Sequence, residues 1–86
     1  MFYGQFFKVP GTISPDVGND GKKCAYAGTN RVFDLRGTDA TETKCRDECN
    51  KIKSCVAFSG IWNSFCIGCK VALSESHSGT KAFKKE

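Results

Sequence analysis

The 86-residue chain is poor in aliphatic side chains and has no long apolar run. Leu, Ile, Val and Phe together account for only 18 residues. No stretch approaches the roughly 20 apolar residues that span a bilayer, so we expect no transmembrane segment. A domain of this size buries only about 60% of its unfolded surface, and a core of this composition is marginal without covalent staples.

Motifs for catalysis and for nucleic-acid binding are also lacking. The one histidine, His77, lies in a Ser/Gly-rich loop with no acid or nucleophile at a motif spacing, and we expect it to be solvated. There is no phosphate-binding loop, nucleophile elbow or glycosylation sequon. The net charge of +4 comes from scattered basic residues, whereas nucleic-acid binding needs a clustered basic face. We therefore expect a protein that is not an enzyme, uses no cofactor and binds no nucleic acid.

The N-terminal segment has a composition of its own. Residues 1–9 include the aromatic side chains Phe2, Tyr3, Phe6 and Phe7, without the basic and apolar regions of a secretion signal. Residues 10–23 hold both prolines and three glycines, which is loop composition. We therefore divide the chain into an aromatic arm and loop, residues 1–23, and a compact domain, residues 24–86.

The compact domain is expected to contain short strands around one helix. The helix is predicted over residues 41–53, with Asp39 or Thr41 as its cap. An aromatic side chain, Trp62, falls at the tip of a hairpin within residues 54–71, and the last strand is expected at an edge of the sheet. The predicted strands are residues 24–27, 31–35, 54–59, 64–71 and 81–83.

The predicted helix has a poor apolar face. Cys45, Cys49 and Ile52 form one stripe at helical spacing, and charged or polar residues surround them. One buried aliphatic side chain contributes about 1.5–3 kcal/mol, which is too little to dock a helix of this length. We therefore expect the two cysteines to dock the helix, through disulfides or a metal.

Geometry restricts how the six cysteines pair. Cys66 and Cys69 point to opposite faces if their strand is continuous, so they should not pair with each other. Cys45 and Cys49 lie one helical turn apart, where a bridge would be strained. Each helix cysteine should instead reach a different strand. Cys49 is only six residues from Cys55, so we expect the short bridge Cys49–Cys55. Cys45 then pairs with Cys66, and Cys69 is the partner left for Cys24, whose pairing the sequence leaves open.

The spacing Cys45-x3-Cys49-x5-Cys55-Val-Ala-Phe58, followed by Cys66, resembles the PAN/apple domain. In that family a helix with two cysteines one turn apart lies on a small antiparallel sheet, to whose central strands it is bridged. The resemblance covers residues 24–71. It implies an α+β fold, the Cys45–Cys66 and Cys49–Cys55 bridges, an extracellular setting, and non-catalytic binding of protein or carbohydrate.

Three alternative interpretations involve a metal ion or redox chemistry. Cys45, Cys49, Cys66 and Cys69 have the spacing of zinc ligands and would suit an intracellular adaptor, but this set leaves two cysteines unused. Cys66-x2-Cys69 matches a redox motif, yet it falls in a strand rather than at a helix N-terminus. Residues 16–21 hint at a calcium loop that lacks the closing Glu. We therefore expect no metal, and an oxidising compartment: secreted, cell-surface or lumenal.

The expected function is binding, in one of two forms. The first is an adhesion-like module for a protein or glycan ligand, and the second is a structural subunit of a larger complex, anchored by the aromatic arm. The predicted contacts are an aromatic and amide tip, the arm, and a basic C-terminal stretch as secondary anion contacts. These residues are Trp62, Asn63, Phe2, Tyr3, Phe6, Phe7, Lys81, Lys84 and Lys85.

Overall fold

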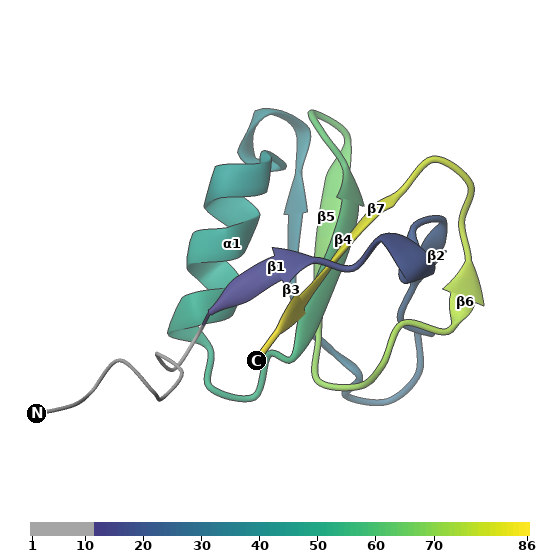
Figure 1. Cartoon of the computed structure of the whole chain (residues 1–86). Helices are drawn as coiled ribbons and strands as arrows, with labels where there is room; N and C mark the ends of the chain where they lie inside the picture. Colours follow the sequence, from purple (N-terminus) through teal and green to yellow (C-terminus); the bar gives the residue numbers. More distant parts are fainter. Residues whose placement is uncertain (1–11) are drawn as a thin grey trace, which may run out of the picture.

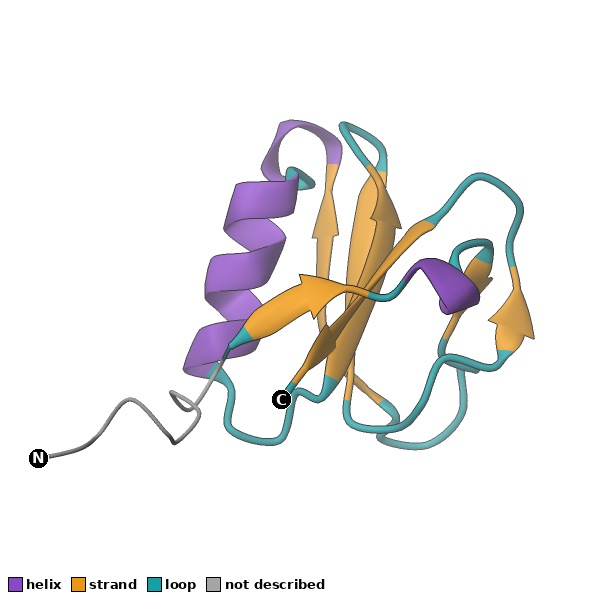
Figure 2. Ribbon diagram, viewed as in Figure 1, coloured by secondary structure: helices purple, strands orange, loops and turns teal. Residues whose placement is uncertain are grey.

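The computed structural model describes residues 12–86, so the aromatic arm lies outside the described residues. A five-stranded antiparallel sheet in the order β1-β7-β4-β5-β3 carries one α-helix on one face and a two-stranded ribbon, β2-β6, to its side (Figures 1 and 2). This is an α+β fold, as the sequence predicts. The strands are β1 (Ile13–Pro15), β2 (Lys22–Lys23), β3 (Arg31–Arg36), β4 (Ala57–Ile61), β5 (Phe65–Cys69), β6 (Glu75–Ser76) and β7 (Lys81–Lys85). The helices are η2 (Val17–Asn19), η3 (Gly37–Asp39) and α1 (Glu42–Lys51).

Helix α1 begins at a threonine cap. The Thr41 hydroxyl accepts a hydrogen bond from the Lys44 backbone N–H at 3.1 Å, which satisfies one of the free donors of the first turn. Asp39, the alternative cap, instead accepts from the Lys44 ammonium at 3.1 Å. Cys45 and Cys49 are the buried residues of the helix, so the predicted cysteine stripe is the face that docks.

Strand β5 separates two cores because its side chains alternate. Phe65, Ile67 and Cys69 point to the face away from α1, and Cys66 points toward the helix. Gly68 also faces the helix side, where the Phe33 ring lies so close that a Cβ on Gly68 would overlap it. The sheet is therefore covered on both faces.

The core on the helix side is built mainly of sulfur and aromatic rings. The rings of Phe58 and Phe83 stack with their centroids 4.7 Å apart beneath α1. Ile52 packs at the rim of this core and is only partly buried. The buried members of the core are Ala40, Cys45, Cys49, Cys55, Phe58, Cys66 and Phe83.

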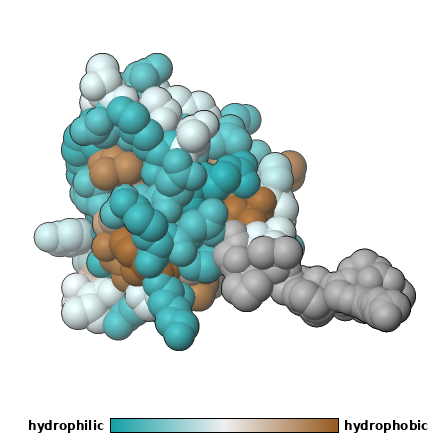
Figure 3. Space-filling model, turned by 90° about the vertical axis from the view of Figure 1, so that its left-hand side faces the viewer, coloured by the Kyte–Doolittle hydropathy of each residue, from teal (hydrophilic) through white to brown (hydrophobic). Residues whose placement is uncertain are grey.

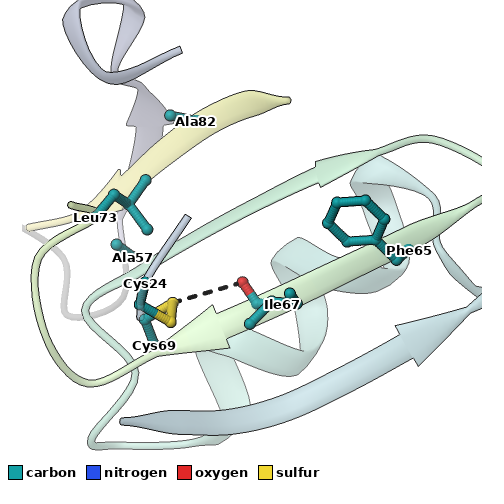
Figure 4. Packing of buried hydrophobic residues seen from close by; sticks show 7 residues of the cluster. All are labelled: Cys24, Ala57, Phe65, Ile67, Cys69, Leu73 and Ala82. Carbon is teal, nitrogen blue, oxygen red and sulfur yellow. Dashed lines mark hydrogen bonds between the residues drawn. A yellow bond between two sulfur atoms is a disulfide. The ribbon is translucent and has the colours of Figure 1, made fainter. Parts of the chain in front are cut away.

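The second core lies between the sheet and the loops on its other face (Figure 4). Leu73, from the segment before β6, covers Ala57 and the Cys24–Cys69 bridge at one end of this core. Phe65 lies at its other end. The buried members are Cys24, Ala57, Phe65, Ile67, Cys69, Leu73 and Ala82.

All six cysteines form disulfides, and the three pairs are those expected from the sequence. One bridge ties α1 to the central sheet, one closes the loop after α1, and one fastens the segment after β2 to the end of β5. They are Cys45–Cys66, Cys49–Cys55 and Cys24–Cys69, with Cα–Cα distances of 6.4, 5.3 and 6.1 Å. Because the zinc alternative needs thiolates, the pairing of every cysteine removes it.

Polar contacts between α1 and the strands β1 and β7 add to the disulfides in docking the helix. The Lys85 ammonium donates to the carbonyl oxygens of Cys49 and Ile52, at 2.8 and 3.1 Å. Arg46 donates to the Ile13 carbonyl at 2.9 Å, and its guanidinium lies 5.4 Å from the centre of the Phe83 ring. The two cysteines therefore dock the helix as expected, through disulfides, and Lys85 and Arg46 add polar contacts that the sequence did not reveal.

Three strand predictions also differ from the structure. Residues 13–15, expected as loop, form β1, and its Pro15 is tolerated because β1 is an edge strand. Residues 24–27, expected as a strand, form a turn-rich loop. β7, expected at an edge, lies between β1 and β4, so the sheet begins with residues that we assigned to the loop before the domain.

Candidate functional site

The predicted aromatic tip is present at the β4–β5 turn, but its two residues differ in exposure. Trp62 is half-buried and packs against the helix-side core, with its ring centroid 6.0 Å from that of Phe83. Asn63 is exposed and has a φ of 68°, a left-handed conformation that Asn tolerates better than most residues. The tip therefore offers part of an indole ring beside an exposed amide.

This turn is fixed to the segment that precedes α1. The Asn63 N–H donates to the Ala40 carbonyl at 2.7 Å, and the Gly37 N–H donates to the Ser64 carbonyl at 3.0 Å. A third bond, from Ser64 N–H to the Ile61 carbonyl at 3.0 Å, closes the turn itself. Backbone hydrogen bonds thus fix the turn against the segment before α1.

The three C-terminal lysines do not form one basic cluster. They lie on β7, where alternation places Lys81 and Lys85 on one face of the sheet and Lys84 on the other. Lys85 is half-buried with its ammonium bound to two helix carbonyls, so it caps α1 and does not serve as the expected anion contact. Lys81 and Lys84 are exposed.

The sequence reasoning missed the most exposed large aromatic side chain of the described residues, Tyr26. Its side chain is 82% exposed on the loop between Cys24 and β3. The Arg31 guanidinium lies 4.8 Å from the centre of its ring, and the same guanidinium donates to the Cys24 carbonyl at 3.1 Å. One ring face is therefore covered by the cation, and the other is available to a ligand.

The loop that carries Tyr26 is tied down at both ends. Cys24 is bridged to Cys69, and the Asn30 carbonyl accepts a hydrogen bond from Lys70 N–H at 2.9 Å. Within the loop, the Asn30 amide donates to the Ala25 carbonyl at 3.4 Å. The signal for this loop was in the sequence, since Gly28-Thr29-Asn30 marks a turn two residues after Tyr26. We took the apolar residues before it for a strand.

Tyr26 and Trp62 do not form one site. Arg31, which stacks on Tyr26, pairs with Cys69 at the end of β5, whereas the Trp62 turn precedes Phe65 at its start. The loop that carries Tyr26 and the turn that carries Trp62 therefore lie at opposite ends of β5. The remaining predicted contacts, Phe2, Tyr3, Phe6 and Phe7, lie outside the described residues.

His77 is not the fully solvated histidine that we expected. Its ring centroid lies 4.9 Å from that of Phe65, at an angle of 57° between the planes. Its carbonyl accepts a hydrogen bond from the Thr80 hydroxyl at 3.0 Å. It packs over one end of the second core and is only half-buried.

A shallow groove of about 290 Å³ runs between β3 and α1. Its lining is mostly charged, with both signs present: Leu35, Asp39, Lys44, Asp47, Glu48 and Lys51. The face that carries α1 is mainly hydrophilic, with separate hydrophobic patches (Figure 3).

Within residues 12–86, no three His, Cys, Asp or Glu side chains gather in a way that could hold a metal ion. In the same residues, no helix has the length and apolar character needed to cross a membrane.

The chain matches no family model, no curated protein and no solved structure. Its class is therefore defined by the structure itself: a small α+β domain fastened by three disulfides. Disulfides at this density indicate an oxidising compartment.

Proposed function

We propose that the protein is a non-catalytic extracellular binding module that mediates protein–protein or protein–carbohydrate contacts. Two features support the proposal. The cysteine spacing resembles that of PAN/apple domains, and the three disulfides make a stiff frame on which surface loops are preorganised.

The observation that carries the proposal is the presentation of Tyr26. A side chain of this size that is 82% exposed buries little apolar surface, so core packing gives little reason for it. Arg31 holds the ring against the frame, which limits its rotamers in advance of binding. Tyr and Arg are enriched at interfaces because they offer a large contact area with polar atoms at the edge. The open ring face suits the C–H face of a sugar or an aliphatic protein side chain.

The predicted tip is the second contact of this proposal. Trp62 and Asn63 offer a ring edge and an amide that is free to hydrogen-bond, on a turn held by the bonds to Gly37 and Ala40. Lys81 and Lys84 are secondary contacts for anionic groups. The arm residues Phe2, Tyr3, Phe6 and Phe7 stay predicted contacts. They also carry the alternative function, a structural subunit anchored to a larger assembly.

The test uses the full oxidised chain on a glycan array and in pull-downs from the native source. We expect retention of a ligand that Tyr26→Ala loses, with an unchanged melting temperature. Val17→Ala is the matched control, because Val17 is 75% exposed and lies on η2, away from the Tyr26 loop. Equal binding by wild type, Tyr26→Ala and Trp62→Ala would contradict the proposal and favour anchoring through the arm.

A further inference from the structure

Strand β3 forms one end of the sheet, and its outer side pairs with no segment within residues 12–86. In the order β1-β7-β4-β5-β3, its inner side pairs with β5. The opposite edge is better protected, because β1 is three residues long, contains Pro15, and has its Ile13 carbonyl bonded to Arg46. An open strand edge is a template for another strand, so β3 is the exposed pairing edge of this fold.

The side chains of β3 are suited to a partner strand. Phe33 and Leu35 are half-buried at the margin of the helix-side core, and Asp34 and Arg36 are exposed on the other face. The register shift between Arg31 and Phe33 disturbs the first part of the strand. The regular part therefore runs from Phe33 to Arg36.

The charges of this regular part are self-complementary. Asp34 and Arg36 flank Leu35 symmetrically, so an antiparallel copy centred on Leu35 places the Asp34 carboxylate opposite the Arg36 guanidinium of the other copy, twice. A register centred on Asp34 would put two carboxylates opposite each other. Within one chain these groups already form an exposed pair, with Arg36 Nε 2.6 Å from Asp34 Oδ1, so pairing with the other copy exchanges one exposed partner for another.

The same register fits the apolar side chains. Leu35 then meets Leu35 of the other copy beside the groove between β3 and α1, which Leu35 lines. Phe33 then faces the start of η3 in the other copy, where Gly37 has no side chain and an added Cβ would meet nothing within 4 Å, so the ring meets no steric obstacle there.

We propose that two copies of this chain pair antiparallel along β3, with Leu35 of each copy on the two-fold axis. The sheet then continues across both copies, and their α1 helices lie on the same face. The paired stretch is short, so the dimer is a weak one whose population depends on concentration. Salt weakens it, because the two cross-strand ion pairs are exposed.

The test measures the mass of the full oxidised chain by light scattering between about 10 µM and about 1 mM in low salt. We expect a monomer–dimer equilibrium in the wild type. Asp34→Arg and Arg36→Asp each place like charges opposite one another, and each should weaken self-association at least about tenfold. The double variant Asp34→Arg/Arg36→Asp restores opposite charges and should dimerise as the wild type does.

A mixture of the two single variants gives the sharpest result. Asp34→Arg carries only positive charge at positions 34 and 36, and Arg36→Asp carries only negative charge there. The two variants should therefore form a heterodimer, although neither should dimerise alone. Lys53→Glu, which changes the net charge as Arg36→Asp does, is the control for charge alone and should dimerise normally. A wild type that is monomeric at about 1 mM overturns the proposal, as do a double variant or a mixture that stay monomeric.

Discussion

The ammonium group of Lys85, in the last strand, donates a hydrogen bond to the carbonyl oxygen of Cys49, in the last turn of α1, over 2.8 Å. The C-terminal end of a helix has carbonyl groups without intrahelical partners and a partial negative charge. A cation from the sheet satisfies both. This contact joins two elements that are far apart in the sequence, and it makes Lys85 part of the fold.

Replacing Lys85 is therefore expected to destabilise the protein. Lys85→Met keeps the apolar stem and loses the bonds to Cys49 and Ile52, which should cost about 1–3 kcal/mol in the free energy of unfolding. Urea denaturation measures the loss. Lys84→Met is the matched control, because Lys84 is exposed on the other face of the same strand, and it should stay within about 0.5 kcal/mol of the wild type. Equal losses of unfolding free energy in Lys85→Met and Lys84→Met would contradict a stabilising role for the hydrogen bonds from Lys85 to α1.

Gly68 is expected to resist substitution because of the ring that covers it. A Cβ at this position would overlap the Phe33 ring, so Gly68→Ala should cost about 1–3 kcal/mol. Adding Phe33→Ala removes the obstacle, and the double variant should lose less than the sum of the two single losses. Gly18→Ala is the control, since nothing lies within 4 Å of the added methyl group. Strict additivity of Gly68→Ala and Phe33→Ala in thermal melts would contradict the overlap.

The three disulfides should contribute in the order of the loops that they close. Their sequence separations are 6, 21 and 45 residues for Cys49–Cys55, Cys45–Cys66 and Cys24–Cys69. The chain-entropy relation gives contributions of about 2, about 3 and about 4 kcal/mol in the same order. Replacing each pair by alanine and measuring denaturation without reductant tests the order. Full reduction should unfold the domain, and a reduced sample with an unchanged melting temperature would refute the central role of the bridges.

Substitutions in the β4–β5 turn can distinguish the effect of backbone conformation at Asn63 from the effect of side-chain packing at Trp62. Asn63 has a φ of 68°, so Asn63→Gly should leave stability within about 0.5 kcal/mol of the wild type, whereas Asn63→Val should lose about 1–2 kcal/mol. Trp62→Ala should also destabilise, because the ring packs beside Phe83. Thermal melts compare the three. If Asn63→Val melts as the wild type does, the turn is not fixed in the conformation described.

The sequence predicted best those features that depend on local periodicity. Helical spacing placed Cys45 and Cys49 on one buried face of the helix. Strand alternation placed Cys66 and Cys69 on opposite faces of the sheet. These two patterns together led to the disulfide pairs. The same alternation places Lys84 on the opposite face of β7 from Lys81 and Lys85. The predicted strand ended at residue 83, so this separation was not foreseen.

The features that the sequence did not reveal depend on long-range pairing. β7 lies inside the sheet because it pairs with both β1 and β4, whereas we expected it at an edge. Long basic side chains can line a central strand when their stems pack and their ammonium groups reach a partner, as Lys85 does. Pro15 suggested a loop because a proline is excluded from most strand positions, but an edge strand accepts it.

The two ends of the described segment lie together. β1 pairs with β7, and the Glu86 N–H donates to the Thr12 carbonyl at 2.8 Å. Anything joined to either end therefore leaves from the same corner of the sheet, the corner far from the β4–β5 turn. A tag or solid support attached after Glu86 would therefore sit at the end of the sheet opposite the β4–β5 turn.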